Sequence, residues 1–268
     1  MKKSVGIIGH GFVGTAMAQV GSAEIYDPNK KEFSKNMKAF SQDLVFVCVP
    51  TPPSPTGDLD TSIVESSARK WKELKKENSI LVIKSTIPVG TVERLCQGIQ
   101  ENNIVHNPEF LTERTANEDF LNPKEVIVGG NKESSETVVE FYKGFYGDKD
   151  IQYFSVPAKT AEMIKITRNS FYALKVSFFN EVYKLCEAMG QDYEEFKNLF
   201  TLNGLHPWIG NQHVSVPGPD GKLGYGGKCL PKDAEGLLKI AEKHDIIMKT
   251  LKAAVTVNEE IINNGGRE

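Results

Sequence analysis

The chain has 268 residues, of which 40% are hydrophobic and 25% are charged, and its net charge is -3. This is the composition of an ordinary folded globular protein, and it excludes a disordered or fibrous chain. The evenly spread basic residues offer no electrostatic footprint for nucleic acid. No apolar run approaches the ~18 residues of a membrane span and no signal-peptide core is present, so we expect a cytoplasmic protein without nucleic-acid or membrane partners.

The first part of the chain alternates short apolar runs with helical patterns. Strands are predicted at Val5–Ile8, Ala23–Tyr26, Leu44–Val49, Ile80–Ile83, Ile104–His106 and Glu125–Val128. This β-α-β alternation predicts an α/β fold of Rossmann type, with a doubly wound parallel sheet flanked by helices. We therefore predict an NAD-binding Rossmann domain over residues 1–155.

Residues 9–14 form a G-x-G-x-x-G fingerprint that follows a strand and opens a helix. Gly9 allows the tight turn, Gly11 lets the backbone approach a pyrophosphate at the helix N-terminus, and Gly14 lets helix and strand pack closely. Asp27, at the end of the second strand, is placed to bond the adenine-ribose 2′-hydroxyl and to repel the extra phosphate of NADP. NAD is thus the predicted cofactor. Its predicted contacts here are Gly9, Gly11, Phe12, Val13, Gly14 and Asp27.

Two loops follow the third and fourth predicted strands, at Val49–Pro53 and Lys84–Thr91. Because ligands bind at the carboxyl ends of strands in such sheets, we expect both loops to face the cofactor. Pro50, Thr51 and Thr86 are the predicted contacts. The alternative is that these Pro, Ser and Thr residues only end strands and cap helices.

After about Pro157 the strand signals cease, and helical patterns take over. Helices are predicted at Ala161–Gly190, Tyr193–Leu202, Pro231–His244 and Ile246–Ile262, with a long loop at Asn203–Gly227. We predict an all-helical domain over residues 156–268 with a long central helix. A loop of this length inside a compact domain is usually functional.

The four cysteines lie far apart and form no C-x-x-C pair, so neither a disulfide framework nor a metal site is predicted. Cys229 differs from the others because it lies in the segment G-Y-G-G-K-C-L-P-K-D, just before a predicted helix that Pro231 helps to start. The helix dipole and the flanking Lys228 and Lys232 favour a thiolate there, and the glycines leave room for a substrate. The alternative is an inert buried cysteine at a helix start.

Ordered motifs along the whole chain resemble a known family, the UDP-glucose 6-dehydrogenases and the wider UDP-glucose/GDP-mannose dehydrogenase group. The motifs are G-H-G-F-V-G, V-P-T-P, S-T-I-P-V-G-T, N-P-E-F-L from Asn107, E-M-I-K-I-T-R-N-S-F from Glu162, F-F-N-E from Phe178, and G-Y-G-G-K-C-L-P-K-D. The resemblance implies that a nucleotide-sugar is oxidised at its C6 alcohol to a carboxylate, with two NAD consumed. The sugar aldehyde is captured by Cys229 as a thiohemiacetal, oxidised to a thioester and released by water.

The resemblance also implies the roles of individual residues. Cys229 is the nucleophile, Asp233 and Lys165 act on the proton and the oxyanion together with Asn169, and Thr86 and Glu113 orient water. The implied catalytic set is Cys229, Asp233, Lys165, Asn169, Thr86, Glu113 and Glu109. Thr86, Glu113 and Lys232 join the cofactor contacts. The implied substrate contacts are Glu109, Phe110, Leu111, Lys165, Asn169, Asn211, Tyr225, Gly226, Gly227 and Cys229.

The long helix at Ala161–Gly190 resembles the family's central helix, which supplies much of a dimer interface, so a homodimer is expected. Two departures bear on the substrate. The family usually continues into a second Rossmann-like domain that holds much of the nucleotide, and Trp208 stands where the family has an arginine that reaches the partner's sugar. We expect UDP-glucose as substrate. The alternatives are GDP-mannose or a UDP-N-acetyl-hexosamine, a two-electron β-hydroxyacid dehydrogenase, and a catalytically impaired NAD-binding module that needs a partner domain.

Overall fold

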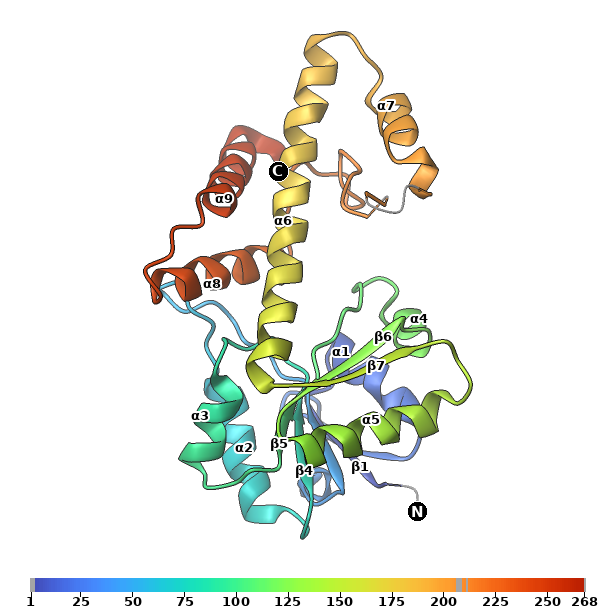
Figure 1. The fold of residues 1–268 in the computed structure, drawn as a ribbon, viewed down its shortest axis with the longest axis vertical. Coiled ribbons are helices and arrows are strands. Elements are labelled where there is room, and N and C mark those ends of the chain that lie inside the picture. Colours follow the sequence, from blue (N-terminus) through green and yellow to red (C-terminus); the bar gives the residue numbers. More distant parts are fainter. Residues whose placement is uncertain (1–2, 206–208, 211, 268) are drawn as a thin grey trace. The chain divides into compact units, whose positions relative to one another are not determined.

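The computed structural model describes residues 3–205, 209–210 and 212–267, which form two compact units (Figure 1). The sheet unit comprises Met1–Pro52 and Leu59–Lys165, and the helical unit comprises Pro53–Asp58 and Ile166–Glu268. The division therefore falls inside a helix, and the domain boundary expected at residue 155 stays a prediction.

The sheet unit is built on a seven-stranded sheet in the order β2-β1-β3-β4-β5-β6-β7. The strands are β1 Val5–Ile8, β2 Ala23–Tyr26, β3 Leu44–Val47, β4 Ile80–Ile83, β5 Ile104–His106, β6 Glu125–Gly129 and β7 Gln152–Val156. Strands β1 to β5 are all parallel to one another. The predicted Rossmann-type α/β fold is thus confirmed, with one change of direction described below.

Helices cover both faces of this sheet. They are α1 Phe12–Met17, α2 Ser62–Leu74, α3 Thr91–Gly98, α4 Ala116–Leu121 and α5 Lys132–Tyr146, with 3-10 turns at Ala18–Val20 and Met37–Phe40. Neighbouring strand residues point to opposite faces. Ile7 packs with side chains of α1, α4 and α5, and Ile8 packs with those of α2 and α3. The strands read as continuous apolar runs because both of their faces are buried.

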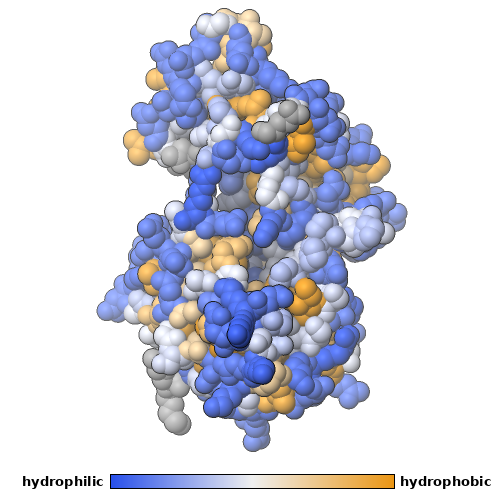
Figure 2. All heavy atoms as spheres, turned by 180° about the vertical axis from the view of Figure 1, so that it is seen from behind, coloured by the Kyte–Doolittle hydropathy of each residue, from blue (hydrophilic) through white to orange (hydrophobic). Residues whose placement is uncertain are grey.

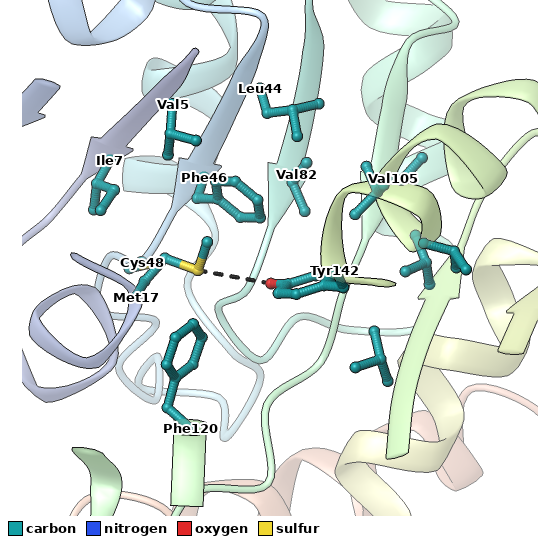
Figure 3. Close-up of a cluster of buried hydrophobic side chains, with 14 of the residues drawn as sticks. Val5, Ile7, Met17, Leu44, Phe46, Cys48, Val82, Val105, Phe120 and Tyr142 are labelled. Carbon is teal, nitrogen blue, oxygen red and sulfur yellow. Dashed lines mark hydrogen bonds between the residues drawn. The ribbon is translucent and has the colours of Figure 1, made fainter. Parts of the chain in front are cut away.

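A row of side chains crosses the sheet on the α5 face and forms its core. Ile7, Phe46, Val82 and Val105 stand in register on four parallel strands. Figure 3 shows them facing Tyr142 of α5, whose hydroxyl oxygen lies 3.6 Å from the sulfur of Met17. This packing holds the ends of β1, β3, β4 and β5 in a fixed order, so the loops that follow them emerge along one edge.

The last two strands depart from the all-parallel expectation. β6 pairs with β5 in the antiparallel sense, through His106 and Gly129, and β7 then pairs with β6 in parallel. The segment after β5 stays at the same edge of the sheet, where Asn107 donates to the Ile127 carbonyl, so β6 enters in the opposite direction. The strand pattern did not predict β7, because its residues are mostly exposed or half-buried and carry no continuous apolar run.

The helical unit is organised by α6 Ala158–Ala188, whose first turns belong to the sheet unit. It also contains α7 Tyr193–Phe200, α8 Leu230–Glu242 and α9 Lys249–Ile261, with short turns at Leu202–Gly204 and Ile262–Gly266. These elements match the predicted helices to within a few residues. Among the described residues, no helix combines the length and apolar character needed to cross a membrane.

Candidate active site

The turn after β1 has the geometry that its glycine fingerprint predicts. Gly9 has φ +89°, and a Cβ there would lie 2.5 Å from the Cys48 carbonyl oxygen. A Cβ on Gly14 would lie 2.0 Å from the Gly9 oxygen, so helix and turn meet as closely as the motif requires. A Cβ on Gly11, the N-cap of α1, would meet nothing within 4 Å. The open space thus lies where a pyrophosphate is expected, while the half-buried Phe12 and Val13 anchor α1 to the core.

The loop after β2 is arranged around the buried carboxylate of Asp27. One oxygen accepts the His10 N–H at 2.8 Å and the other accepts the Asn29 N–H at 2.9 Å. Lys30 Nζ lies 3.1 Å from His10 Nδ1. These bonds fix the carboxylate beside the glycine turn, with lone pairs left for hydroxyl donors. The residues present therefore fit the ribose of NAD better than the phosphorylated ribose of NADP.

The loops after β3 and β4 are tied to each other. Thr51 donates its hydroxyl to the Thr86 carbonyl at 2.8 Å, and Ser85 donates to the Val49 carbonyl at 2.7 Å. Both threonines are buried, whereas Pro50 is exposed. The structure thus brings Thr51 and Thr86 together. Both lie at the carboxyl edge of the sheet, where the two loops were expected.

The N-P-E-F-L segment after β5 meets the first turns of α6 through a buried ion pair. Lys165 Nζ lies 2.9 Å from Glu109 Oε1, with side chains 4% and 8% exposed. The second Glu109 oxygen accepts the Leu111 N–H at 2.7 Å, and Lys165 lies over the Phe110 ring. Glu113 is exposed in the turn that follows. Two predicted catalytic groups therefore neutralise each other, and the ammonium is held close to a fixed place.

A buried hydrogen-bond network around Lys84 and Asn107 was not predicted from the sequence. Lys84 Nζ donates to Asn107 Oδ1 at 2.8 Å, and the Tyr142 hydroxyl donates to the same oxygen at 2.7 Å. Burial lowers the pKa of Lys84 to about 8, against the opposing effects of Cys48 and Glu109. The network holds Asn107, which lies two residues before Glu109 in the chain. Its sequence signals were Asn107 in the N-P-E-F-L motif and Lys84 at the start of the loop after the fourth predicted strand.

The helical unit holds a second buried cluster, at the start of α8. Cys229 is the N-cap of this helix, and Pro231 lies in its first turn. Asp233, fully buried, accepts Asn169 Nδ2 at 2.5 Å on one oxygen and Lys232 Nζ at 2.6 Å on the other. The helix start predicted for Cys229 is thus observed, and the cluster places an acid, an amide and an ammonium within one turn of it.

The remaining predicted substrate contacts lie before Cys229. Tyr225 is buried, and burial raises its pKa to about 12, with Glu235 and Glu259 adding to the effect. Gly226 lies against Arg267, while a Cβ on Gly227 would meet nothing within 4 Å. Asn211, like Trp208, lies outside the described residues. In the part of the chain that is described, no group of three or more His, Cys, Asp or Glu could hold a metal ion.

The chain resembles one protein family over nearly all of its length. Residues 24–146 match the NAD binding domain of the UDP-glucose/GDP-mannose dehydrogenase family, and residues 159–260 match its central domain. The first match confirms the predicted NAD cofactor. It begins after the glycine fingerprint, which therefore rests on the geometry given above.

Individual relatives give the same picture. The chain is 34% identical over 239 residues to the UDP-glucose 6-dehydrogenase of Rhizobium meliloti, covering 85% of this chain and 52% of that protein. It is 37% identical over 219 residues to an uncharacterized protein of Methanocaldococcus jannaschii, covering 76% of this chain and 24% of that one. The chain thus spans about half the length of the UDP-glucose 6-dehydrogenases it matches.

Solved structures share the fold. A UDP-glucose dehydrogenase from Pyrobaculum islandicum superposes with a TM-score of 0.81 at 27% identity, covering 97% of this chain and 69% of that one. A 3-hydroxyisobutyrate dehydrogenase from Mycobacterium tuberculosis superposes with a TM-score of 0.75 at 14% identity, covering 99% and 96%. The second likeness concerns the fold alone.

Proposed function

This chain belongs to the UDP-glucose/GDP-mannose dehydrogenase family, and we propose that it oxidises the C6 alcohol of a nucleotide-sugar to a carboxylate with NAD, UDP-glucose being the expected substrate. The observation that carries the proposal is the place of Cys229 at the N-cap of α8, one turn from the buried cluster of Asp233, Asn169 and Lys232. A two-electron dehydrogenase of the same fold has no use for a thiol there.

In the proposed mechanism, the chain's own groups handle the protons and the acyl transfer. When bound, NAD accepts the electron pair that leaves the sugar carbon in each of the two oxidations. Asp233, together with Lys165, takes up the hydroxyl proton of the alcohol. The Cys229 sulfur then bonds to the aldehyde carbon, and a proton goes to its oxygen, which gives a thiohemiacetal. Oxidation of that adduct leaves a thioester, and water cleaves it to the carboxylate and the thiol.

Two donors are proposed to stabilise the oxygen on the reacting carbon. The Lys165 ammonium is fixed by Glu109, and the Asn169 amide is fixed by Asp233. Each donor has hydrogens beyond the one used in that bond. A donor already held in place needs little reorganisation when charge develops. Thr86 and Glu113 remain the proposed groups for the hydrolytic water.

We also propose a homodimer formed through α6. Phe171, Phe178 and Leu185 are 59%, 53% and 58% exposed and follow each other at intervals of seven residues, so they lie on one face of the helix. Figure 2 shows one face of the molecule, on which hydrophobic residues form patches among hydrophilic ones. A stripe of large apolar residues at heptad spacing is typical of a helix that packs against a second helix.

The proposed reaction is tested by counting NADH. The purified chain is incubated with NAD and with limiting UDP-glucose, GDP-mannose or UDP-N-acetylglucosamine in turn. Two NADH per sugar is the expected result, and the sugar that reacts identifies the substrate. One NADH per sugar would contradict the thioester route and favour a two-electron enzyme. No NADH with any sugar, although NAD binds, would support an NAD-binding module that needs a partner domain.

Cys229→Ser tests the nucleophile, and Cys96→Ser is its matched control because Cys96 is half-buried on α3 in the sheet unit. We expect Cys229→Ser to lower kcat by ~10³-fold or more and Cys96→Ser to leave it unchanged. Equal rates in the two variants would remove Cys229 from the mechanism.

A further inference from the structure

The segment that leads into Cys229 has little backbone stiffness of its own. It is rich in glycine, and Gly224 and Gly227 have φ +68° and +75°, which favour glycine. A segment of this kind has many accessible conformations in isolation. The place of the thiol at its end must therefore be set by contacts from other elements.

Two buried amides make those contacts. Asn180 of α6 accepts the Gly224 N–H on its Oδ1 at 2.9 Å. Asn258 of α9 accepts the Tyr225 N–H at 2.7 Å and donates its Nδ2 to the Tyr225 carbonyl at 3.0 Å. The two asparagines are 3% and 4% exposed. The three bonds satisfy consecutive backbone groups in the way that a neighbouring strand would.

The close approach of Asn258 also explains one of the glycines. A Cβ on Gly224 would lie 2.6 Å from Asn258 Oδ1 and 3.3 Å from the Ile261 side chain. Any other residue would push the amide away from the backbone. The same stretch is clasped by Arg267, whose guanidinium donates to the Gly224 carbonyl at 3.0 Å and pairs with Asp220. The glycine thus makes room for a holding side chain.

We propose that Asn180 and Asn258 are positioning residues that hold the Gly224–Cys229 segment so that the thiol stands at one fixed place at the start of α8. The inference rests on the proposed function only in its catalytic consequence. Nucleophile and carbon must meet within ~3.5 Å, and a misplacement of ~1 Å costs ~10²-fold in rate. Neither asparagine touches the predicted NAD contacts of the sheet unit, so the KM for NAD is expected to stay unchanged.

The variants follow from the individual bonds. Asn258→Leu keeps the volume and removes all bonds to Tyr225, and Asn180→Leu removes the acceptor for the Gly224 N–H. Asn180→Asp keeps that acceptor and is the rescue variant. Ser177→Ala is the matched control, because Ser177 donates to the Ala254 carbonyl at 2.6 Å. This bond joins α6 and α9, the helices that carry Asn180 and Asn258. Ser177 is as buried as the two asparagines, but its bond does not involve the glycine segment.

Two readouts are independent of turnover. The first is hydrogen exchange of the peptide that covers residues 220–230, and the second is the rate at which iodoacetamide alkylates Cys229, resolved by mass spectrometry. We expect both to rise ~10-fold or more in the two leucine variants and to stay near wild type in Asn180→Asp and Ser177→Ala. Alkylation of the buried Cys186 is the internal reference, because global loosening of the helical unit would raise it as well.

The kinetic readout adds the catalytic consequence. In the leucine variants kcat is expected to fall ~10- to 100-fold, while the KM for NAD stays constant and alkylation of Cys229 becomes faster. The proposal is overturned if Ser177→Ala matches the leucine variants in exchange and alkylation, or if Cys186 responds as strongly as Cys229. If the wild-type chain turns over no nucleotide-sugar, the proposed function fails, but exchange and alkylation still decide whether the amides fix Cys229.

Discussion

The two units differ in how completely they bury their own apolar side chains. In the sheet unit, the strand residues from Ile7 to Val105 are covered on both faces by helices of the same unit. In the helical unit, large apolar residues stay exposed along α6, and Leu199 and Leu205 are exposed at and after the end of α7. The sheet unit thus completes its own core, whereas the helical unit presents apolar surface that a second chain can cover.

The two units also differ in how the charged residues of their buried polar clusters are paired. In the sheet unit, Glu109 and Lys165 come from a loop and a helix 56 residues apart and neutralise each other directly. In the helical unit, Lys232 and Asp233 are sequence neighbours, and the amide of Asn169 completes the cluster. Both clusters join segments far apart in the chain, but the first is an ion pair alone, while the second adds a neutral amide to an ion pair of sequence neighbours at a helix start.

The largest expected effect comes from breaking the ion pair of the sheet unit. Lys165→Met leaves the Glu109 carboxylate buried without its cation, which costs ~3–5 kcal/mol of unfolding free energy. The proposed reaction loses an oxyanion donor as well, so kcat is expected to fall ~10²-fold or more. Denaturant unfolding and NADH formation measure the two effects.

The control for this prediction is the surface pair of Lys70 and Glu73, whose side chains are 42% and 62% exposed. Lys70→Met is expected to change the unfolding free energy by less than ~1 kcal/mol, because water screens an exposed pair. If the two methionine variants were equally stable, the buried pair would have no special role in the sheet unit.

The second prediction concerns the apolar stripe of the helical unit. Phe178→Glu places a charge on the face formed with Phe171 and Leu185, and we expect it to weaken dimerisation ~10²-fold or more, measured by sedimentation equilibrium. Lys184→Glu introduces the same residue at an exposed position on another face of α6 and should leave the dimer intact. A monomeric wild-type chain would contradict the proposed dimer.

A smaller effect is expected from Asp27, which sets the cofactor preference of the sheet unit. Replacing it with Ser removes the charge that faces the adenine ribose, while a hydroxyl still accepts one backbone N–H. The ratio of kcat/KM for NAD over NADP is expected to fall at least ~10-fold, or ~1.4 kcal/mol. An unchanged ratio would mean that another group rejects the phosphate.

The last prediction is a pH dependence of the sheet unit, due to His106 at the end of β5. Its ring nitrogens are buried, and neither makes a hydrogen bond of good geometry with a described residue. Burial lowers its pKa from the ordinary 6.5 to about 3, although a backbone contact with Ser85 raises it somewhat. The unfolded chain therefore takes up the proton first. The stability that neutral His106 contributes is complete above pH 6.5 and is lost as the pH falls toward 3, by at most ~1.4 kcal/mol per pH unit.

His106→Gln isolates this contribution, because it removes the titrating group and leaves the other ionisable side chains in place. Unfolding free energies measured at several pH values between 6.5 and 4 should fall less steeply in this variant than in the wild-type chain. Parallel curves would show that His106 already has a proton or a partner in the folded protein.

Much of the fold and of the site was predictable because the decisive signals are local. A strand, a glycine turn and a helix that follow each other determine the dinucleotide loop, since glycine at φ +89° and an uncrowded N-cap are properties of a few neighbouring residues. The place of Cys229 before Pro231 likewise indicates a helix start. The periodic pattern of α6 is long enough to be read without its neighbours.

The partners of these groups were not predictable. The reversal of β6 and the exposed edge strand β7 depend on what packs beside them, and their own residues do not specify it. Trp208 and Asn211 lie outside the described residues, so their roles stay predictions. The predictions about the exact sugar, the dimer and the individual catalytic roles stay predictions.

The sequence by itself determined the Rossmann-type fold, the cofactor, the family and the helix start that carries Cys229, because each rests on short stretches whose stereochemistry or motif is complete in itself. Only the tertiary structure decided which side chains and backbone groups form hydrogen bonds with each other. Lys84 meets Tyr142 across 58 positions of the chain, Asn180 meets Gly224 across 44, and Asn258 meets Tyr225 across 33. Hydrogen bonds over such separations depend on how whole helices and strands pack, and no local pattern records that.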